Sequence, residues 1–213
     1  MKEMTIKTKL LIAFVVLGLI PVLVLSLISI NKSTNELMDK SYAQLESVRQ
    51  IKQNQIESFF AERMSDVKVY AFNTAVQTAT QRFNKAFQEG GINSSQWQKW
   101  DRAHGAKLEL YVEEYGYYDI FFVNPQGDVV YTVARESDLG ANLKTGRLAN
   151  SPLGNAYQEG LKETSFIDFD WYEVSDDAAS FVSTPMRDQE GNLIGVLIYQ
   201  ISLKAINNIM QER

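Results

Sequence analysis

The feature that most constrains this chain is an unbroken apolar run from Leu10 to Ile30. About 20 consecutive apolar residues match the hydrocarbon thickness of a bilayer, where a helix satisfies all of its own backbone hydrogen bonds. The sequence therefore predicts a transmembrane helix over residues 10–30. The competing interpretation is a cleaved signal peptide, whose apolar core usually spans about 7–15 residues before a small-x-small cleavage site. This run is longer, and Ser26–Ile30 offers no clear site, which favours an uncleaved anchor.

The charges beside this run predict its orientation. Three lysines precede it and one acidic residue opposes them, so the positive-inside rule places the N-terminus in the cytoplasm. The lysines are Lys2, Lys7 and Lys9, and the acidic residue is Glu3. The rest of the chain is then expected in the periplasm or extracellular space, held at the inner (cell) membrane by a single N-terminal span.

Composition limits the partners of the part outside the membrane. The formal net charge of the whole chain is -5, and the cytoplasmic tip contributes +2, which leaves -7 for the rest. An acidic exterior argues against nucleic acid and anionic lipid headgroups as partners. The absence of cysteine excludes disulfides and thiolate chemistry.

The single histidine gives little support for a metal or catalytic centre. With no cysteine beside it, a zinc site at His104 would need Asp or Glu for every other ligand. His104 follows Trp97 and Trp100 at helical spacing, so we predict that it packs on a helix face near the core. The acidic segments 173–177 and 188–190 lack the spacing of a dedicated calcium loop. We therefore expect no catalysis, no metal and no cofactor.

A long helix is predicted to leave the membrane. Residues 34–79 contain no proline or glycine, and apolar residues recur every three or four positions, as in an amphipathic helix. This pattern predicts one continuous spine helix over residues 31–90, ending by the Gly90-Gly91 pair. The spine could pair with a second copy or pack on its own domain. Polar seam residues make a strict coiled coil poor, which favours packing on its own domain; these residues are Ser41, Gln44 and Gln55.

The rest of the chain is predicted to form an α+β domain. A second helix, capped by Asn93, Ser94 or Ser95, should run to about Tyr115 with an aromatic inward face. Strand patterns with intervening turns then predict a five-stranded antiparallel sheet with its helices on one side. The strands are expected at 117–123, 129–133, 165–172, 180–186 and 193–202, a short helix at 151–161, and another helix from 203 to 210.

Several short segments occur in one order that resembles a known family. They are 117–121, 125–133, 138–143, 151–153, 168–175, 181–185, 195–200 and 206–210, with 9–14 and 55–60 near the N-terminus. In this order they resemble the Cache domain, the PAS-like extracytoplasmic sensor module of bacterial methyl-accepting chemotaxis proteins and related transmembrane receptors. The resemblance implies a membrane-distal module, a homodimer in the full receptor, and a second Cache module and second span after Arg213. One departure is Asp170-Trp171, where similar proteins carry small residues or proline.

The expected division of the chain follows from these patterns. Residues 1–9 form the cytoplasmic tip, 10–30 the membrane helix, 31–90 the spine, 91–202 the Cache sensor domain, and 203–213 the start of an exit helix.

The strand over residues 165–172 carries the candidate ligand site. Strict alternation places Phe166, Asp168, Asp170 and Tyr172 on one face, and Ile167, Phe169 and Trp171 on the other, which is predicted to face the core. The polar face could receive a ligand or be solvated. Asp168 and Tyr172 match the family pattern, so the resemblance favours them over Asp170 as ligand-binding residues. Tyr118 and Tyr131, from the segments that carry the resemblance, complete the candidate set.

These observations predict extracytoplasmic small-molecule sensing rather than enzyme activity. A carboxylate such as Asp168 suits an ammonium-bearing ligand, an amine or an amino acid, and an aromatic neighbour adds cation–π attraction. Binding would shift the long helices and bias a cytoplasmic output. The alternative is a membrane-anchored structural or adhesion module whose pocket is filled by its own side chains.

Overall fold

The computed structural model describes residues 5–211, and the chain divides into two compact units between Gln53 and Asn54. Helix α1 (Ile6–Ala71) makes up the first unit and continues into the second. Residues 1–4 of the predicted cytoplasmic tip, with Lys2 and Glu3, lie outside the described residues, as do residues 212–213 of the predicted exit helix. We call the part from Asn54 onward the C-terminal unit.

The N-terminal unit contains the predicted membrane helix. Residues 10–30 are helical throughout, and within residues 5–211 α1 is the one helix long and apolar enough to cross a membrane. Its large apolar side chains are exposed, as a lipid-facing helix requires. Length and composition therefore fit a single membrane span. Further along this unit Leu37, Tyr42 and Leu45 are also exposed.

The spine, which was predicted to be one continuous helix, consists of two helices. Helix α1 ends at Ala71, and α2 (Thr74–Gly90) starts after Asn73. The backbone of Asn73 is extended, and its side-chain Oδ1 accepts a hydrogen bond of 2.9 Å from the N–H of Ala75. An asparagine that satisfies a first-turn N–H in this way starts a new helix in place of continuing the old one. The prediction of a continuous helix over residues 31–90 was therefore wrong.

The second predicted helix is confirmed. Helix α3 (Ser95–Tyr115) starts at Ser94, whose Oγ accepts a hydrogen bond from the N–H of Trp97. It ends at Gly116, which has a left-handed φ of 69° that favours glycine. Trp97, on the predicted aromatic inward face, is buried, and Leu108 on the same helix is buried as well.

The sheet confirms the α+β prediction. Its strand order is β2-β1-β5-β4-β3, and every neighbouring pair is antiparallel. The strands are β1 (Asp119–Val123), β2 (Val129–Thr132), β3 (Ser165–Tyr172), β4 (Asp177–Arg187) and β5 (Leu193–Ser202). Helix α4 (Pro152–Gly160) lies between β2 and β3 in the chain, and α5 (Leu203–Gln211) follows β5.

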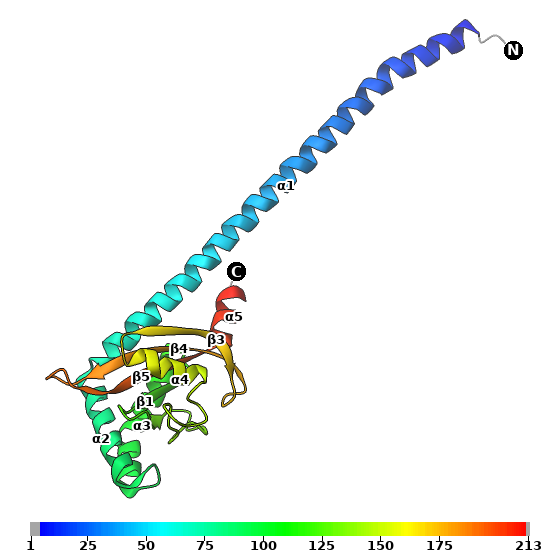
Figure 1. Ribbon diagram of the computed structural model, residues 1–213. Coiled ribbons are helices and arrows are strands. Elements are labelled where there is room, and N and C mark those ends of the chain that lie inside the picture. The colour runs from blue at the N-terminus through cyan, green and yellow to red at the C-terminus, as the bar shows by residue number, and fades with distance from the viewer. Residues whose placement is uncertain (1–4, 212–213) are drawn as a thin grey trace. The chain divides into compact units, whose positions relative to one another are not determined.

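Both faces of the sheet are covered, so the prediction of helices on one side was wrong. The C-terminal part of α1, α2 and α3 supply the first core, with Val67, Phe83 and Leu108 among its buried side chains. Helix α4 and the loop before it supply a second core around Leu148 and Tyr157, and Figure 1 shows α4 lying beside β4 and β5. Residues 194–201 of the central strand β5 are buried on both faces, because successive side chains point to opposite faces of a sheet.

A bulge in β3 overturns the predicted facing of this strand. Ile167 pairs with Phe181 while Asp170 pairs with Ala179, so β3 carries one extra residue between these pairs. After the extra residue every side chain points to the face opposite to that given by strict alternation. Tyr172 consequently lies in the second core with no exposed surface, whereas Trp171, predicted to be in the core, is 59% exposed.

Candidate functional site

Three carboxyl side chains and two tyrosines lie close together where β1 starts and β3 ends. They are Tyr118, Asp119, Glu136, Asp138 and Tyr172, which we call the acidic cluster. Each of the two tyrosine hydroxyls donates a hydrogen bond to one of the carboxylates. The negative charges of all three carboxylates contribute to raising the pKa of both tyrosines. The cluster therefore joins the sheet to the loop that follows β2.

Asp119 holds the start of β1 to the end of β2. Its Oδ1 accepts hydrogen bonds from the backbone N–H groups of Val133 at 2.8 Å and Ala134 at 3.0 Å. Its Oδ2 accepts a hydrogen bond from the hydroxyl of Thr132. Asp119 has no exposed surface, and burial raises its pKa to about 7, although these hydrogen bonds oppose the shift. The nearby Asp138 raises this pKa further.

Asp138 and Tyr172 bind each other inside the second core. The hydroxyl of Tyr172 donates a hydrogen bond of 2.7 Å to Oδ2 of Asp138, and both side chains are fully buried. Burial raises the pKa of Asp138 and of Tyr172, while the hydrogen bond from Tyr172 opposes the shift at Asp138. Within residues 5–211, the second carboxylate oxygen of Asp138 has no hydrogen-bond partner.

Two more oxygens near the cluster are buried without a donor. Tyr118 donates a hydrogen bond of 2.8 Å to Oε1 of Glu136, and Oε2 of Glu136 has no partner within the part of the chain that the structure describes. Gln200, which pairs with Asp119 across the sheet and is 1% exposed, donates from Nε2 to Ser175. Its Oε1 likewise finds no donor among the described residues.

The cation nearest to the cluster in the sequence is directed elsewhere. Arg135 is the only basic residue between Val133 and Asp138. Its Nη2 lies 2.8 Å from Oδ1 of Asp101 and 3.1 Å from Oε1 of Glu109, both on α3. Arg135 also has a left-handed backbone with φ of 53°. Its ion pairs therefore hold the loop after β2 against α3.

This arrangement suits a ligand with several N–H donors. A buried polar group without a hydrogen bond costs free energy, and a primary ammonium offers three donors and a positive charge. Among residues 5–211 no group of three or more His, Cys, Asp or Glu is arranged to hold a metal ion. Asp138, Tyr172 and Gln200 are all buried, so the centre of the cluster lies inside the protein.

The structure brings two of the five predicted site residues into the cluster. These are Tyr118 and Tyr172. Asp168 and Asp170 are exposed, and each carboxylate accepts a hydrogen bond of 2.7 Å from the N–H of the residue that follows it. Tyr131 lies in the first core, with its ring centroid 4.5 Å from that of Phe83.

Sequence reasoning missed Asp119, Glu136, Asp138 and Gln200. Asp119 did carry a signal, because it is a charged residue inside the apolar segment Tyr117–Val123. His104 lies outside the cluster, against Trp100 and within 3.4 Å of Arg82, and partial burial lowers its pKa.

The raised pKa of Asp119 predicts a pH dependence of stability. The ordinary value is 3.8 and the folded value about 7, so between these pH values the folded chain keeps a proton that the unfolded chain has released. The unfolding free energy should therefore fall as the pH rises from about 4 to about 7. In Asp119→Asn, which cannot ionise, denaturant unfolding at several pH values should show a flatter decline. A decline as steep as in the unmodified protein would contradict the assignment.

Three solved structures share this fold. The ligand-binding domain of the Campylobacter jejuni chemoreceptor Tlp3, solved with 4-methylisoleucine, is 16% identical with a TM-score of 0.53, over 76% of this chain and 59% of that chain. The ligand-binding domain of the Pseudomonas aeruginosa amino acid chemoreceptor PctC, solved with GABA, is 14% identical with a TM-score of 0.50, over 78% and 66%. The sensor domain of E. coli DcuS is 15% identical with a TM-score of 0.51, over 73% and 97%.

These similarities define the class of fold. Over about three quarters of its length the chain has the fold of these three sensor or receptor domains, in agreement with the Cache-like fold that the resemblance of the sequence implied. The chain spans about three fifths to two thirds of the two chemoreceptor domains that it matches. No protein-family model matches the sequence, and no curated protein sequence does.

Proposed function

We propose that this protein is a membrane-anchored sensory module that binds a small ammonium-bearing molecule at the acidic cluster. The observation that carries this proposal is the set of three buried acceptor oxygens, on Glu136, Asp138 and Gln200, that have no donor among residues 5–211. Leaving a buried acceptor unpaired costs about 1–3 kcal/mol, so a ligand that donates to all three gains a large part of its affinity there.

The chemistry of similar domains supports this ligand class. The PctC domain was solved with GABA and the Tlp3 domain with 4-methylisoleucine, and both compounds carry a primary ammonium group. In this chain Tyr118 and Tyr172 stand beside the carboxylates, and an aromatic ring adds cation–π attraction to an ammonium group. An amine or an amino acid is therefore the expected ligand.

The anchor and the loop connect binding to signalling. The apolar run in α1 and the lysines before it support an inner-membrane protein with its N-terminus in the cytoplasm and its C-terminal unit outside. Binding would move the loop that Arg135 holds against α3 and so favour one arrangement of the helices over another. In the full receptor we expect a homodimer and a chemotaxis output.

A structural or adhesion module remains the second candidate. It is favoured by the second core, where Tyr157 and Tyr172 have no exposed surface and the module's own side chains fill the space beside the cluster. Such a module would bind no solute.

Ligand binding by the full chain in nanodiscs separates the two candidates. Its thermal unfolding would be followed with GABA, L-leucine and putrescine, each beside an analogue lacking the amino group. At least one amine should raise the melting temperature, because a ligand that binds only the folded state stabilises it. Asp138→Asn should weaken the binding of that amine by about 30-fold or more, because loss of one side of a buried charge pair costs about 2–5 kcal/mol.

Asp168→Asn is the matched control. It removes an exposed carboxylate from β3, so affinity for the amine should stay within about twofold of the unmodified protein. No shift with any amine would favour the structural alternative, and a loss of binding in Asp168→Asn alone would place the site on the exposed face of β3.

A further inference from the structure

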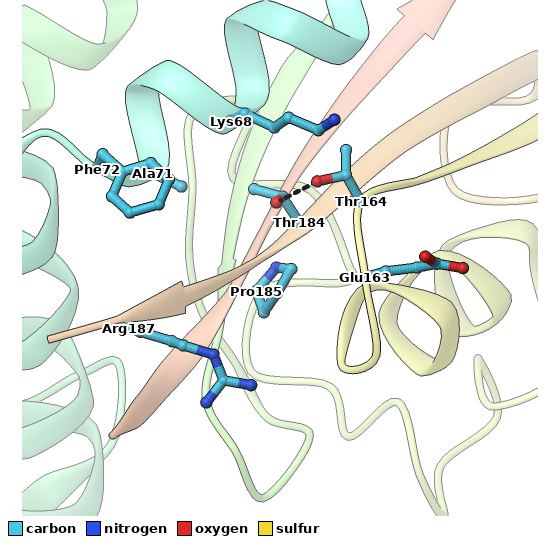
Figure 2. Close-up of a pocket in the computed structure, with 8 residues that line it drawn as sticks. All are labelled: Lys68, Ala71, Phe72, Glu163, Thr164, Thr184, Pro185 and Arg187. Carbon is cyan, nitrogen blue, oxygen red and sulfur yellow. Dashed lines mark hydrogen bonds between the residues drawn. The ribbon is translucent and has the colours of Figure 1, made fainter. Parts of the chain in front are cut away.

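A separate hollow of about 290 Å³ lies between the C-terminal end of α1, the segment just before β3 and the second half of β4. Figure 2 shows the lining residues, which come from these three segments. Its apolar lining consists of Ala71 and Phe72 at the end of α1 and Pro185 on β4. Small-molecule sites are commonly concave and mostly apolar, with a few polar groups that fix the orientation of the ligand. This hollow has that composition and is distinct from the acidic cluster.

The polar groups of the hollow are dominated by two free cations. Lys68 and Arg187 line it, and within residues 5–211 neither forms an ion pair. Arg187 donates one hydrogen bond of 3.1 Å to the carbonyl of Gly191, which leaves most of its donors available. By contrast, Arg135 and Arg147 in the same unit each pair with a carboxylate. Two unpaired cations beside one apolar hollow indicate an anionic ligand.

A pair of hydroxyls adds a donor to the lining of the hollow. The hydroxyls of Thr164 and Thr184 lie 2.7 Å apart, and Figure 2 shows the amino end of Lys68 extending toward Thr164. Whichever hydroxyl accepts in this pair keeps its own hydrogen for a third group, such as a ligand oxygen. Glu163 also lines the hollow, and its negative charge disfavours a ligand with two negative charges.

One hydrogen-bonded side chain holds the walls together. The Nε2 of Gln77 donates to the carbonyl of Ala71 at 3.0 Å and to the carbonyl of Arg187 at 2.9 Å. This link connects the last turn of α1 to the end of β4. The two backbones on either side of the hollow are therefore fixed before any ligand arrives, which lowers the entropic cost of binding.

We propose that this hollow binds a monocarboxylate with a small apolar body. Its carboxylate pairs with Lys68 and the threonine hydroxyls, Arg187 supplies the second positive charge, and its apolar part lies against Ala71, Phe72 and Pro185. The module then has two sites of opposite charge preference, and the second touches the last turn of α1 directly. This inference does not depend on amine binding at the acidic cluster.

Calorimetry on the full chain in nanodiscs of neutral lipid tests the proposal. The probes are butyrate, isovalerate and benzoate, each beside its uncharged amide. At least one carboxylate should bind at least about tenfold more tightly than its amide, since hydrogen bonds to charged groups contribute about 1.5–3 kcal/mol. Lys68→Gln and Arg187→Gln should each weaken this binding by about tenfold, whereas Glu163→Gln should strengthen it.

Lys85→Gln is the matched control, because Lys85 is an exposed lysine of α2 that pairs with Glu89 at 3.8 Å. It should leave carboxylate binding unchanged. The proposal is overturned if no carboxylate binds below about 10 mM, if acid and amide bind alike, or if Lys85→Gln weakens binding as much as Lys68→Gln. Thermal unfolding of each variant shows whether a loss of binding reflects a loss of folding, and Asp138→Asn should retain carboxylate binding.

Discussion

Replacing Phe83 with alanine is expected to lower the unfolding free energy by about 3–5 kcal/mol, because a large aromatic ring leaves a closed cavity. Phe83 lies on α2 with no exposed surface, and its ring centroid is 4.5 Å from that of Tyr131 and 5.6 Å from that of Trp97. These contacts join α2 to α3 and to the sheet. Denaturant unfolding of the protein in detergent measures the change.

Phe72→Ala is the matched control for this prediction. Phe72 follows the end of α1 and is 81% exposed, so its removal should change the unfolding free energy by less than about 1 kcal/mol. Equal losses in the two variants would mean that the first core is not centred on Phe83.

Tyr172→Ala is expected to cost at least about 4 kcal/mol, because it empties part of the second core and leaves Asp138 without its donor. The ring of Tyr172 packs edge-on against Phe181, with 5.2 Å between centroids, and its hydroxyl binds Asp138. Tyr172→Phe keeps the ring and removes only the hydroxyl, so its cost should be about 1–3 kcal/mol. The difference between the two variants separates packing from hydrogen bonding.

The adjacent residue gives the sharpest comparison. Trp171→Ala should cost less than about 1 kcal/mol, since this larger side chain is 59% exposed on an edge strand. If Trp171→Ala destabilises the protein more than Tyr172→Ala does, the bulge in β3 is misplaced and strict alternation holds along the strand.

Sequence patterns predicted the elements well because they are local. The strands at 165–172 and 193–202, and the helix starting near Ser94, follow from hydrophobic period and capping alone. The helix break at Asn73 was missed because neither proline nor glycine marks it. The break between α1 and α2 is also stabilised by Gln77, whose side chain donates a hydrogen bond to the carbonyl of Arg187, a residue far along the chain.

The site was harder to predict because its partners are distant in sequence. The bulge in β3 is determined by the pairing of this strand with β4, and no feature of the sequence Ile167–Asp170 predicts that a residue is left unpaired there. Tyr172 and Asp138, which form a hydrogen bond, are 34 positions apart in the sequence. Asp119 accepts a hydrogen bond from the N–H of Val133, which follows the β1–β2 hairpin. Alternation therefore identified Tyr172 as a site residue for a partly wrong reason, since the same rule placed Asp168 beside it.

The strand order has a consequence for how the chain reaches its folded state. The β1–β2 and β3–β4 hairpins are each local, but they are joined only by β5, the last strand, which pairs with β1 on one side and β4 on the other. During synthesis, the five-stranded sheet cannot be completed until Leu193–Ser202 has been made. Until then the chain contains two separate hairpins whose strand edges are unpaired and whose apolar faces are exposed. Partly folded chains of this kind are prone to aggregate. Closure of the sheet is therefore expected to be a late and comparatively slow step, because Phe121 must find Ile198 across most of the module.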